Sequence, residues 1–171
     1  MTPEKQRIWS DRMVSPQFIN VLRKIHNRLK DCDVNWAVVG SLGLALRGIP
    51  IEPHDIDIMT DRLGAYEIGR IFLESVTKRV APRTSETIQS HFGALEIDGV
   101  KVEIMGDFRV RLRDGIWEKP LEMTQYKQMA HVEEMLVPVL SLECEYQLSL
   151  KLGRTDKAEM LKKLLPDMKL H

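Results

Sequence analysis

The hydrophobic residues of the first third of the chain follow two spacings in succession. Residues 15–31 carry an apolar residue every three or four positions, and Ser15 followed by Pro16 is typical of a helix start. We therefore predict an N-terminal helix over residues 15–31. The next apolar run, Trp36–Val39, is continuous and short enough to form a buried strand. The apolar helical positions are Phe18, Val21, Leu22, Ile25 and Leu29.

A short helix is expected directly after this strand. Gly40-Ser41 breaks the apolar run, and the next apolar residues have a helical spacing. Gly48 and Pro50 then end the helix, because glycine commonly follows the last helical turn and proline cannot continue it. The apolar positions of this helix are Leu42, Leu44, Ala45 and Leu46.

Two aspartates occupy alternate positions of the next predicted strand, Asp55–Met59. Side chains alternate between the two faces of a strand, so Asp55 and Asp57 share one face while Ile56 and Ile58 share the other. Neighbouring carboxylates repel one another and disfavour a strand. We therefore expect a divalent cation to neutralise them.

A hairpin later in the chain contributes a third carboxylate. Phe92–Ile97 and Val100–Met105 both alternate, and Asp98-Gly99 between them is a strong two-residue turn signal. Glu103 lies on the face opposite Val102 and Ile104. We expect its strand to neighbour the Asp55–Met59 strand, which would bring Glu103 close to both aspartates.

The segments around this hairpin are less regular. Asp61 can cap a helix over residues 62–76, whereas residues 77–89 fit a weak strand or a loop over the site. Within residues 106–137, three alternating arginines fit either a solvated edge strand or a surface that holds phosphates or the acceptor. The buried face expected for the helix is Leu63, Ile68, Ile71 and Phe72, and the arginines are Arg109, Arg111 and Arg113.

Two helices are predicted at the C-terminus, over residues 141–165. Ser141 is a suitable N-cap for the first helix, with acidic residues in its first turn, and Gly153 ends it. Thr155 can cap the second helix, which carries leucines at helical spacing. Residues 34–105 then form the core between the N-terminal helix and these two helices.

Composition restricts the remaining possibilities. A chain of 171 residues fits one domain, 1–171, with a substantial core. The 25 basic residues balance the 25 acidic residues, so no long nucleic acid is expected as a partner. No run of eighteen apolar residues and no secretory signal are readable, so we expect a cytoplasmic protein without a membrane partner. Cys32 and Cys144 lack metal-binding spacing and are expected to be buried free thiols, although one disulfide would also fit.

The order of these motifs resembles a known family. Gly40-Ser41, thirteen residues, and then Asp55-Ile-Asp57, each on its expected element, is similar to the signature of the DNA polymerase beta-like nucleotidyltransferase superfamily. The similarity is greatest to its small bacterial branch, which includes the lincosamide and aminoglycoside nucleotidyltransferases. It implies an α+β fold with helices packed on a mixed β-sheet. It also implies a third acid on a later neighbouring strand, where Glu103 stands.

The resemblance implies the transfer of a nucleoside monophosphate from a nucleoside triphosphate to an acceptor hydroxyl, with release of pyrophosphate. Asp55 and Asp57 would hold two Mg²⁺ ions, and Glu103 would hold the ion on the acceptor side and take the hydroxyl proton. The residues expected to bind phosphates are Gly40, Ser41 and Lys151. Ser41 could instead be only a helix cap, and Lys151 only a surface lysine.

Two functions therefore stay open at the sequence level. The first is an enzyme that modifies a hydroxyl of a small molecule, a protein or an RNA. The second is a non-catalytic or regulatory nucleotide-binding protein, such as one component of a toxin–antitoxin pair. No separate acceptor domain is visible, so the acceptor pocket would come from residues 77–91 and 106–137 or from a second subunit of a homodimer.

Overall fold

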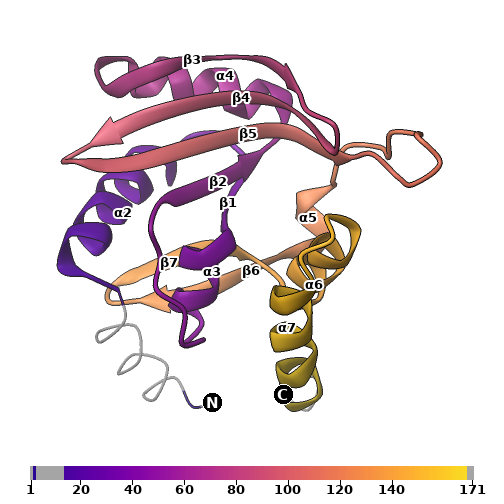
Figure 1. The fold of residues 1–171 in the computed structure, drawn as a ribbon. Coiled ribbons are helices and arrows are strands. Elements are labelled where there is room, and N and C mark those ends of the chain that lie inside the picture. Colours follow the sequence, from indigo (N-terminus) through magenta and orange to yellow (C-terminus); the bar gives the residue numbers. More distant parts are fainter. Residues whose placement is uncertain (1, 3–13, 169–171) are drawn as a thin grey trace.

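A mixed β-sheet runs through the protein, with helices on both of its faces (Figure 1). The structure is a computed structural model that describes residue 2 and residues 14–168. The described residues form seven strands in the order β3-β4-β5-β2-β1-β7-β6, which confirms the predicted α+β class. The strands are β1 (Trp36–Val39), β2 (Ile56–Thr60), β3 (Val76–Thr84), β4 (Ile88–Ile97), β5 (Val100–Val110), β6 (Lys127–Val132) and β7 (Met135–Leu140).

The helices begin and end near the predicted positions. Ser15 caps the N-terminal helix through its side chain, which accepts a hydrogen bond from the Phe18 amide. Ser141 caps the first C-terminal helix in the same way. The helices are α2 (Pro16–Leu29), α3 (Gly40–Leu46), α4 (Arg62–Ile71), α5 (Met123–Tyr126), α6 (Leu142–Lys151) and α7 (Thr155–Met168), with a 3-10 turn at Leu73–Ser75.

Strand pairing brings the two acidic strands together. β2 lies between β1, to which it is antiparallel, and β5, to which it is parallel. β1 in turn pairs in parallel with β7, the strand that leads into α6. The predicted hairpin is present as β4 and β5, and its turn residues Asp98 and Gly99 both have positive φ, as a two-residue hairpin turn requires. The prediction that the strands of Asp57 and Glu103 are neighbours is confirmed.

Alternation along the strands separates a core face from a cavity face. On β2 and β5, Ile56, Ile58, Val102 and Ile104 are fully buried and pack with residues of α2, α3 and α4. The intervening residues of both strands, together with Val39 of β1, point to the opposite face. That second face carries Asp57 and Glu103, as their alternation with isoleucine and valine predicted.

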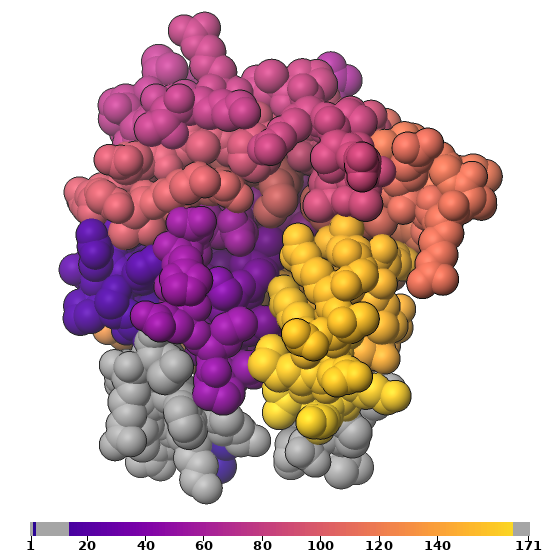
Figure 2. Space-filling model, in the orientation of Figure 1, coloured from indigo at the N-terminus to yellow at the C-terminus, as the bar shows by residue number. Residues whose placement is uncertain are grey.

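The C-terminal helices close this second face from one side. Leu142 of α6 and Leu161 of α7 pack against Leu44 of α3 and against Ile49. The space-filling view shows the C-terminal helices, in yellow, beside the purple residues around α3 and below the pink strands (Figure 2). The two helices therefore stand opposite the strands that carry the acids.

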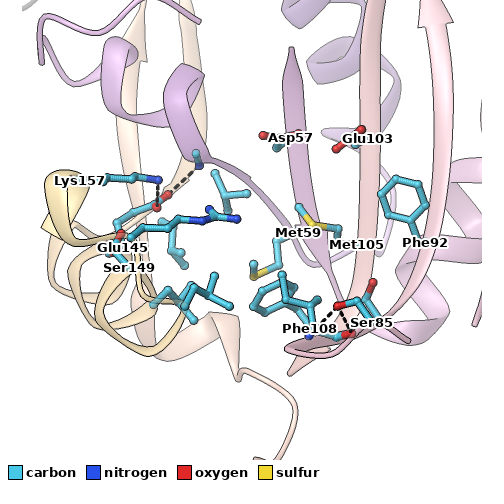
Figure 3. A pocket seen from close by; sticks show the side chains of 18 of the residues that line it. Asp57, Met59, Ser85, Phe92, Glu103, Met105, Phe108, Glu145, Ser149 and Lys157 are labelled. Carbon is cyan, nitrogen blue, oxygen red and sulfur yellow. Dashed lines mark hydrogen bonds and ion pairs between the residues drawn. The ribbon is translucent and has the colours of Figure 1, made fainter. Parts of the chain in front are cut away.

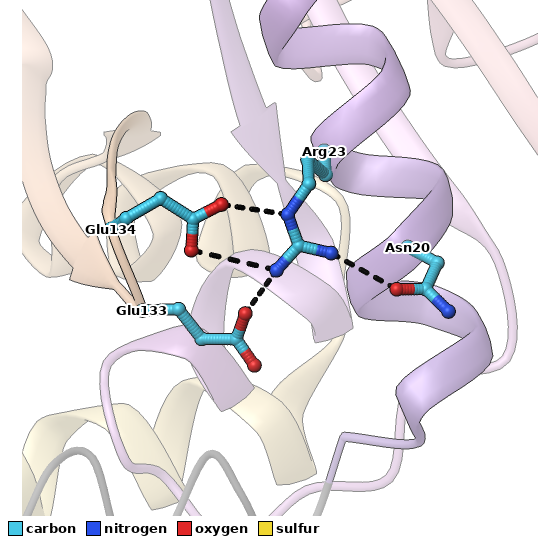
Figure 4. Close-up of polar contacts among 4 residues, drawn as sticks. All are labelled: Asn20, Arg23, Glu133 and Glu134. Atoms are coloured by element: carbon cyan, nitrogen blue, oxygen red, sulfur yellow. Dashed lines mark hydrogen bonds and ion pairs between the residues drawn. The ribbon is translucent and has the colours of Figure 1, made fainter.

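An arginine joins α2 to the turn between β6 and β7. Arg23 donates from Nε to Glu134 Oε1 at 2.7 Å and from another nitrogen to Asn20 Oδ1 at 2.9 Å, and it also contacts the Glu133 carboxylate (Figure 4). Glu133 has a positive φ of 52°. The planar guanidinium can serve several acceptors at once, so this contact fixes the position of the hairpin turn relative to α2.

Several local predictions were wrong. Leu63 is 80% exposed, because the sheet-facing side of α4 is formed by Ala65 and Ile68 and Leu63 points away from it. Of the two alternatives for residues 77–89, by contrast, the strand is confirmed: most of these residues belong to β3, at one edge of the sheet, and to the start of β4. The three arginines do not share an edge strand: Arg109 lies near the end of β5, a strand inside the sheet order, and Arg111 and Arg113 follow that strand. Cys32 is exposed, and only Cys144 is a buried free thiol.

The predicted single domain, 1–171, includes residues 1, 3–13 and 169–171, which lie outside the described residues, so this boundary stays a prediction. Within residues 14–168, no helix is both long and apolar enough to cross a bilayer.

Candidate active site

Two acids meet at the same level of two parallel strands. Asp57 of β2 is the register partner of Glu103 of β5, so their side chains leave the same face of the sheet from adjacent positions. Asp55 lies just before β2 rather than within it. It is close enough to Asp57 to raise the pKa of that residue. Of the three predicted acids, Asp57 and Glu103 are therefore the two that the strand register places side by side, and Asp55 lies near Asp57.

A cavity of about 280 Å³ opens over this acid pair. Asp57 and Glu103 form one wall, and Glu145, Ser149 and Lys157 from the C-terminal helices form the opposite wall (Figure 3). Apolar side chains separate the two walls, and cations stand around them. The apolar lining is Val39, Met59, Ile88, Phe92, Met105, Phe108, Leu140, Leu148 and Leu152, and the cations are Arg83, Arg154 and Lys157.

The environment of Asp57 strongly disfavours its ionised form. Burial is the largest cause and the negative charge of Glu103 is the next, and together with Asp55 and Glu145 they raise the pKa of Asp57 from 3.8 to about 7. Glu103 differs because Lys101 lies 2.7 Å from its carboxylate. Asp57 forms no such ion pair with any residue that the structure describes. The unneutralised acid of this site is therefore Asp57.

Gly40 contacts Asp57 from the neighbouring strand end. A Cβ atom at position 40 would lie 2.9 Å from Asp57 Oδ2, and the residue has a φ of +67°. Both features require glycine, since other residues rarely adopt this conformation and would strike the carboxylate. We predicted that Gly40 lets phosphates approach the backbone closely, and its place in the cavity lining agrees with that role. Its contact with Asp57 is an additional reason that the sequence did not reveal.

Glu145 is a site residue that sequence reasoning missed. Its side chain belongs to α6 and is 5% exposed, and its Oε1 accepts a hydrogen bond of 2.8 Å from the Gly40 amide. Lys157 of α7 approaches the other oxygen at 3.4 Å. We interpreted Glu145 only as an acidic residue in a first helical turn. Its spacing of three residues from both Leu142 and Leu148 places it on the buried side of the helix, and this was the available signal.

Three of the predicted site residues do not line the cavity. Ser41 follows the lining residue Gly40, and Asp55 stands two positions before the lining residue Asp57, but neither belongs to the lining itself. Lys151 points elsewhere and forms an ion pair of 2.9 Å with Glu118. Lys157, one helix later, is the lysine that lies inside the cavity. The phosphate-binding roles of Ser41 and Lys151 stay predictions.

The donor set is suited to magnesium. Mg²⁺ prefers hard oxygen ligands, and burial together with the negative charges of Glu103, Asp55 and Glu145 raises the pKa of Asp57, so a cation here would favour its ionised form. Among the described residues, no group of three acidic, histidine or cysteine side chains is already arranged around one point. Asp57 and Glu103 lie side by side on adjacent strands, and the predicted metal-binding roles of Asp55, Asp57 and Glu103 stay predictions.

Similarity to known proteins agrees with this site. Residues 21–162 match the family described as aminoglycoside-2''-adenylyltransferase. The chain belongs to this family. A protein of Thermotoga maritima, described as a candidate nucleotidyltransferase, is 57% identical; its crystal structure has a TM-score of 0.81, and the match covers 92% of this chain and 98% of the other. The adenylyltransferase family match and this relative confirm the resemblance to the polymerase beta-like nucleotidyltransferase superfamily.

Two more distant structures share the fold of this adenylyltransferase family member. A lincosamide antibiotic adenylyltransferase with bound lincomycin is 15% identical, with a TM-score of 0.53 and coverage of 87% of this chain and 97% of the other. ANT(2'')-Ia in complex with adenylyl-2''-tobramycin is 12% identical, with a TM-score of 0.57 and coverage of 88% and 91%. The chain matches no curated protein sequence at a significant level.

Proposed function

We propose that the protein transfers a nucleoside monophosphate, by preference an adenylyl group, from a nucleoside triphosphate to an acceptor hydroxyl. The observation that carries this proposal is the register pairing of Asp57 with Glu103 at a cavity that also contains Gly40. Two adjacent carboxylates beside a glycine turn suit the transfer of a phosphoryl-type group, because the phosphate chain needs both metal ligands and close backbone approach. The description of the family supports adenylyl as the group.

Magnesium is the cofactor that this reaction would use. Asp57, Glu103 and Asp55 would hold it, and two bound ions would neutralise charge on the attacking and leaving oxygens. Glu103 is the proposed base for the acceptor hydroxyl, a role worth about a hundredfold to ten-thousandfold in rate. Its position supports this role, because it stands beside Asp57 on the adjacent strand and lines the same cavity.

The protein's own cations and amides would position the donor. Lys157, Arg154 and Arg83 surround the cavity and are suited to neutralising a triphosphate, which carries several negative charges. Ser41 and Lys151 are proposed as further phosphate contacts. For Lys151, this role requires release from Glu118. The apolar surface formed by residues such as Phe108 and Leu148 would exclude water from the reacting groups.

The acceptor is proposed to be a hydroxyl on a small molecule, a protein or an RNA. Lincomycin and tobramycin, the antibiotics in the structures of the distant relatives, are natural first candidates to test. A homodimer in which a second subunit completes the acceptor pocket is also part of the proposal, as is a cytoplasmic location. Acceptor candidates can be separated by the experiment that tests the activity itself.

That experiment combines a binding and a turnover measurement. The protein is titrated with a non-hydrolysable ATP analogue and Mg²⁺, and it is then incubated with ATP labelled at the α-phosphate and a panel of acceptors that includes lincomycin, tobramycin, protein and RNA. Label transfer with pyrophosphate release, lost in Asp57→Asn, is the expected result. The absence of any nucleotide binding would overturn the proposal.

The regulatory alternative has its own expected result in the same experiment. A nucleotide-binding component of a toxin–antitoxin pair would bind the analogue with Mg²⁺ but would release no pyrophosphate with any acceptor. The pairing of Asp57 with Glu103 favours the enzyme, because a protein that only binds nucleotide has no need for the proposed base.

A further inference from the structure

A buried carboxylate lies between two elements of the cavity and has no role in the proposed reaction. Glu145 is 5% exposed, and its two oxygens contact different partners. Oε1 accepts from the Gly40 amide at the start of α3, and Oε2 faces Lys157 of α7. Glu145 therefore connects Gly40, beside Asp57, with Lys157 of α7; Figure 3 shows Glu145 and Lys157 side by side.

The two contacts of Glu145 differ in quality. The Gly40 hydrogen bond, at 2.8 Å, has the length expected of a bond to a charged acceptor. The Lys157 contact, at 3.4 Å, is longer than the 2.7–2.9 Å typical of a charge-assisted hydrogen bond. The carboxylate is thus firmly anchored at Gly40, while the ammonium of Lys157 is held mainly by charge attraction.

We propose that Glu145 is a positioning residue that holds Lys157 in the cavity until the phosphate chain of the nucleotide takes over that lysine. The proposal rests on the proposed function, since it concerns the same triphosphate. A triphosphate carries more negative charge than one carboxylate, so Lys157 exchanges Glu145 for a phosphate oxygen. Glu145 keeps its hydrogen bond to Gly40. The attraction between Glu145 and Lys157 must be broken when the nucleotide binds, and this weakens nucleotide binding.

The surroundings of Lys157 support this exchange. Lys157 is only about one-fifth exposed, so an anionic partner stabilises its charge. It lines the same cavity as Asp57 and Gly40. Without the Glu145 carboxylate, the C-terminal side of the cavity would present two cations, Arg154 and Lys157, with no anion among the described lining residues of α6 and α7.

Glutamine at position 145 tests the exchange with little disturbance of the fold. Its amide oxygen can still accept the Gly40 hydrogen bond, but the charge that attracts Lys157 is gone. Titration calorimetry with a non-hydrolysable ATP analogue and Mg²⁺ should therefore give at least threefold tighter binding for Glu145→Gln than for the wild type. In turnover, KM for ATP should fall without an increase in kcat.

Two control variants separate this exchange from other effects of charge. Glu143→Gln removes the same charge from the same helical turn at an exposed position, and its affinity should stay within about twofold of the wild type. Lys157→Met should weaken binding at least tenfold. In the Lys157→Met background, adding Glu145→Gln should produce no gain, because there is no lysine left to release.

A second measurement on the wild type keeps the proposal testable if Glu145→Gln does not fold. The carboxyl carbon resonance of Glu145 should shift during the nucleotide titration with the same midpoint as calorimetry gives. An unmoved resonance, or a Glu145→Gln protein that binds equally or more weakly, would overturn the exchange and leave the proposed function intact. A wild type that binds no nucleotide would instead overturn the proposed function.

Discussion

Asp57 and Glu103 are direct register partners on two parallel strands, and only Glu103 has a lysine beside it. Two carboxylates at neighbouring strand positions repel each other, and the pKa of Asp57 rises to about 7 as a result of burial and of this repulsion. Folding thus places an acid where it is destabilising in the absence of a cation. The first two predictions measure this destabilisation of the metal-free protein.

Replacement of Asp57 by asparagine should have opposite effects with and without metal. At pH 8 the wild-type carboxylate is ionised, so Asp57→Asn removes repulsion and should raise the melting temperature of the metal-free protein. The same variant should lose the further rise that Mg²⁺ gives the wild type, because an oxygen ligand is lost. Thermal melts of both proteins with Mg²⁺ and with a chelator measure both effects. Destabilisation of the metal-free variant, together with no Mg²⁺ effect on the wild type, would contradict the metal site.

The stabilisation by Asp57→Asn should depend on pH in a defined direction. The unfolded chain releases the Asp57 proton near its ordinary pKa of 3.8, whereas the folded protein keeps it until about pH 7. The wild type therefore loses stability relative to the variant as the pH rises between these values, by up to about 4 kcal/mol, and the difference is constant above pH 7. Urea unfolding of both proteins at several pH values in a chelator measures it. A pH-independent difference would exclude the raised pKa.

Alanine at Gly40 should damage the site beyond its effect on the backbone. The positive φ alone costs about 1–2 kcal/mol for a residue with a Cβ atom. Gly153→Ala is a matched control, since Gly153 has a φ of +70° and no atom within 4 Å of an added Cβ. Both variants should lose stability, Gly40→Ala the more because its Cβ pushes against Asp57, and only Gly40→Ala should lose nucleotide affinity. Equal affinities in calorimetry would mean that Gly40 is only part of a helix start.

The phosphate contacts can be ranked by single substitutions. Ser41→Ala should weaken binding of the ATP analogue only modestly, because it removes one hydroxyl. Lys151→Met should have a smaller effect than Lys157→Met, since Lys151 must first leave Glu118 and Lys157 already lies in the cavity. Calorimetry at one Mg²⁺ concentration gives the order. A larger loss for Lys151→Met would show that the C-terminal helices rearrange when nucleotide binds.

The sequence was most informative where local chemistry determines structure. The helix starts at Ser15 and Ser141, the turn at Asp98-Gly99 and the alternation around Asp57 and Glu103 each depend on a few adjacent residues, and the structure contains all of them. Neighbouring strands could be inferred because two acids need a common partner. The acid pair could therefore be predicted from the sequence.

Contacts between residues that are far apart in the sequence were harder to predict. Glu145 receives its hydrogen bond from a residue 105 positions earlier, and no local pattern names that partner. The orientation of α4, which leaves Leu63 exposed, depends on how closely Gly64 can approach Thr60. Lys151 and Lys157 differ because α6 lines the cavity with a face that does not include Lys151, whereas α7 presents Lys157 to it. Each of these outcomes depends on packing that periodicity alone does not specify.

The sheet is complete at Leu140, before α6 begins, and this order of the chain has a consequence for how such proteins can diversify. The acids belong to an upstream module, and the opposing wall belongs to a downstream module of two helices. Insertions, deletions or recombination beyond Leu140 can reshape the cavity while the register of Asp57 with Glu103 is untouched. Proteins that descend from one ancestor can in this way acquire different acceptor substrates and retain the same reaction chemistry.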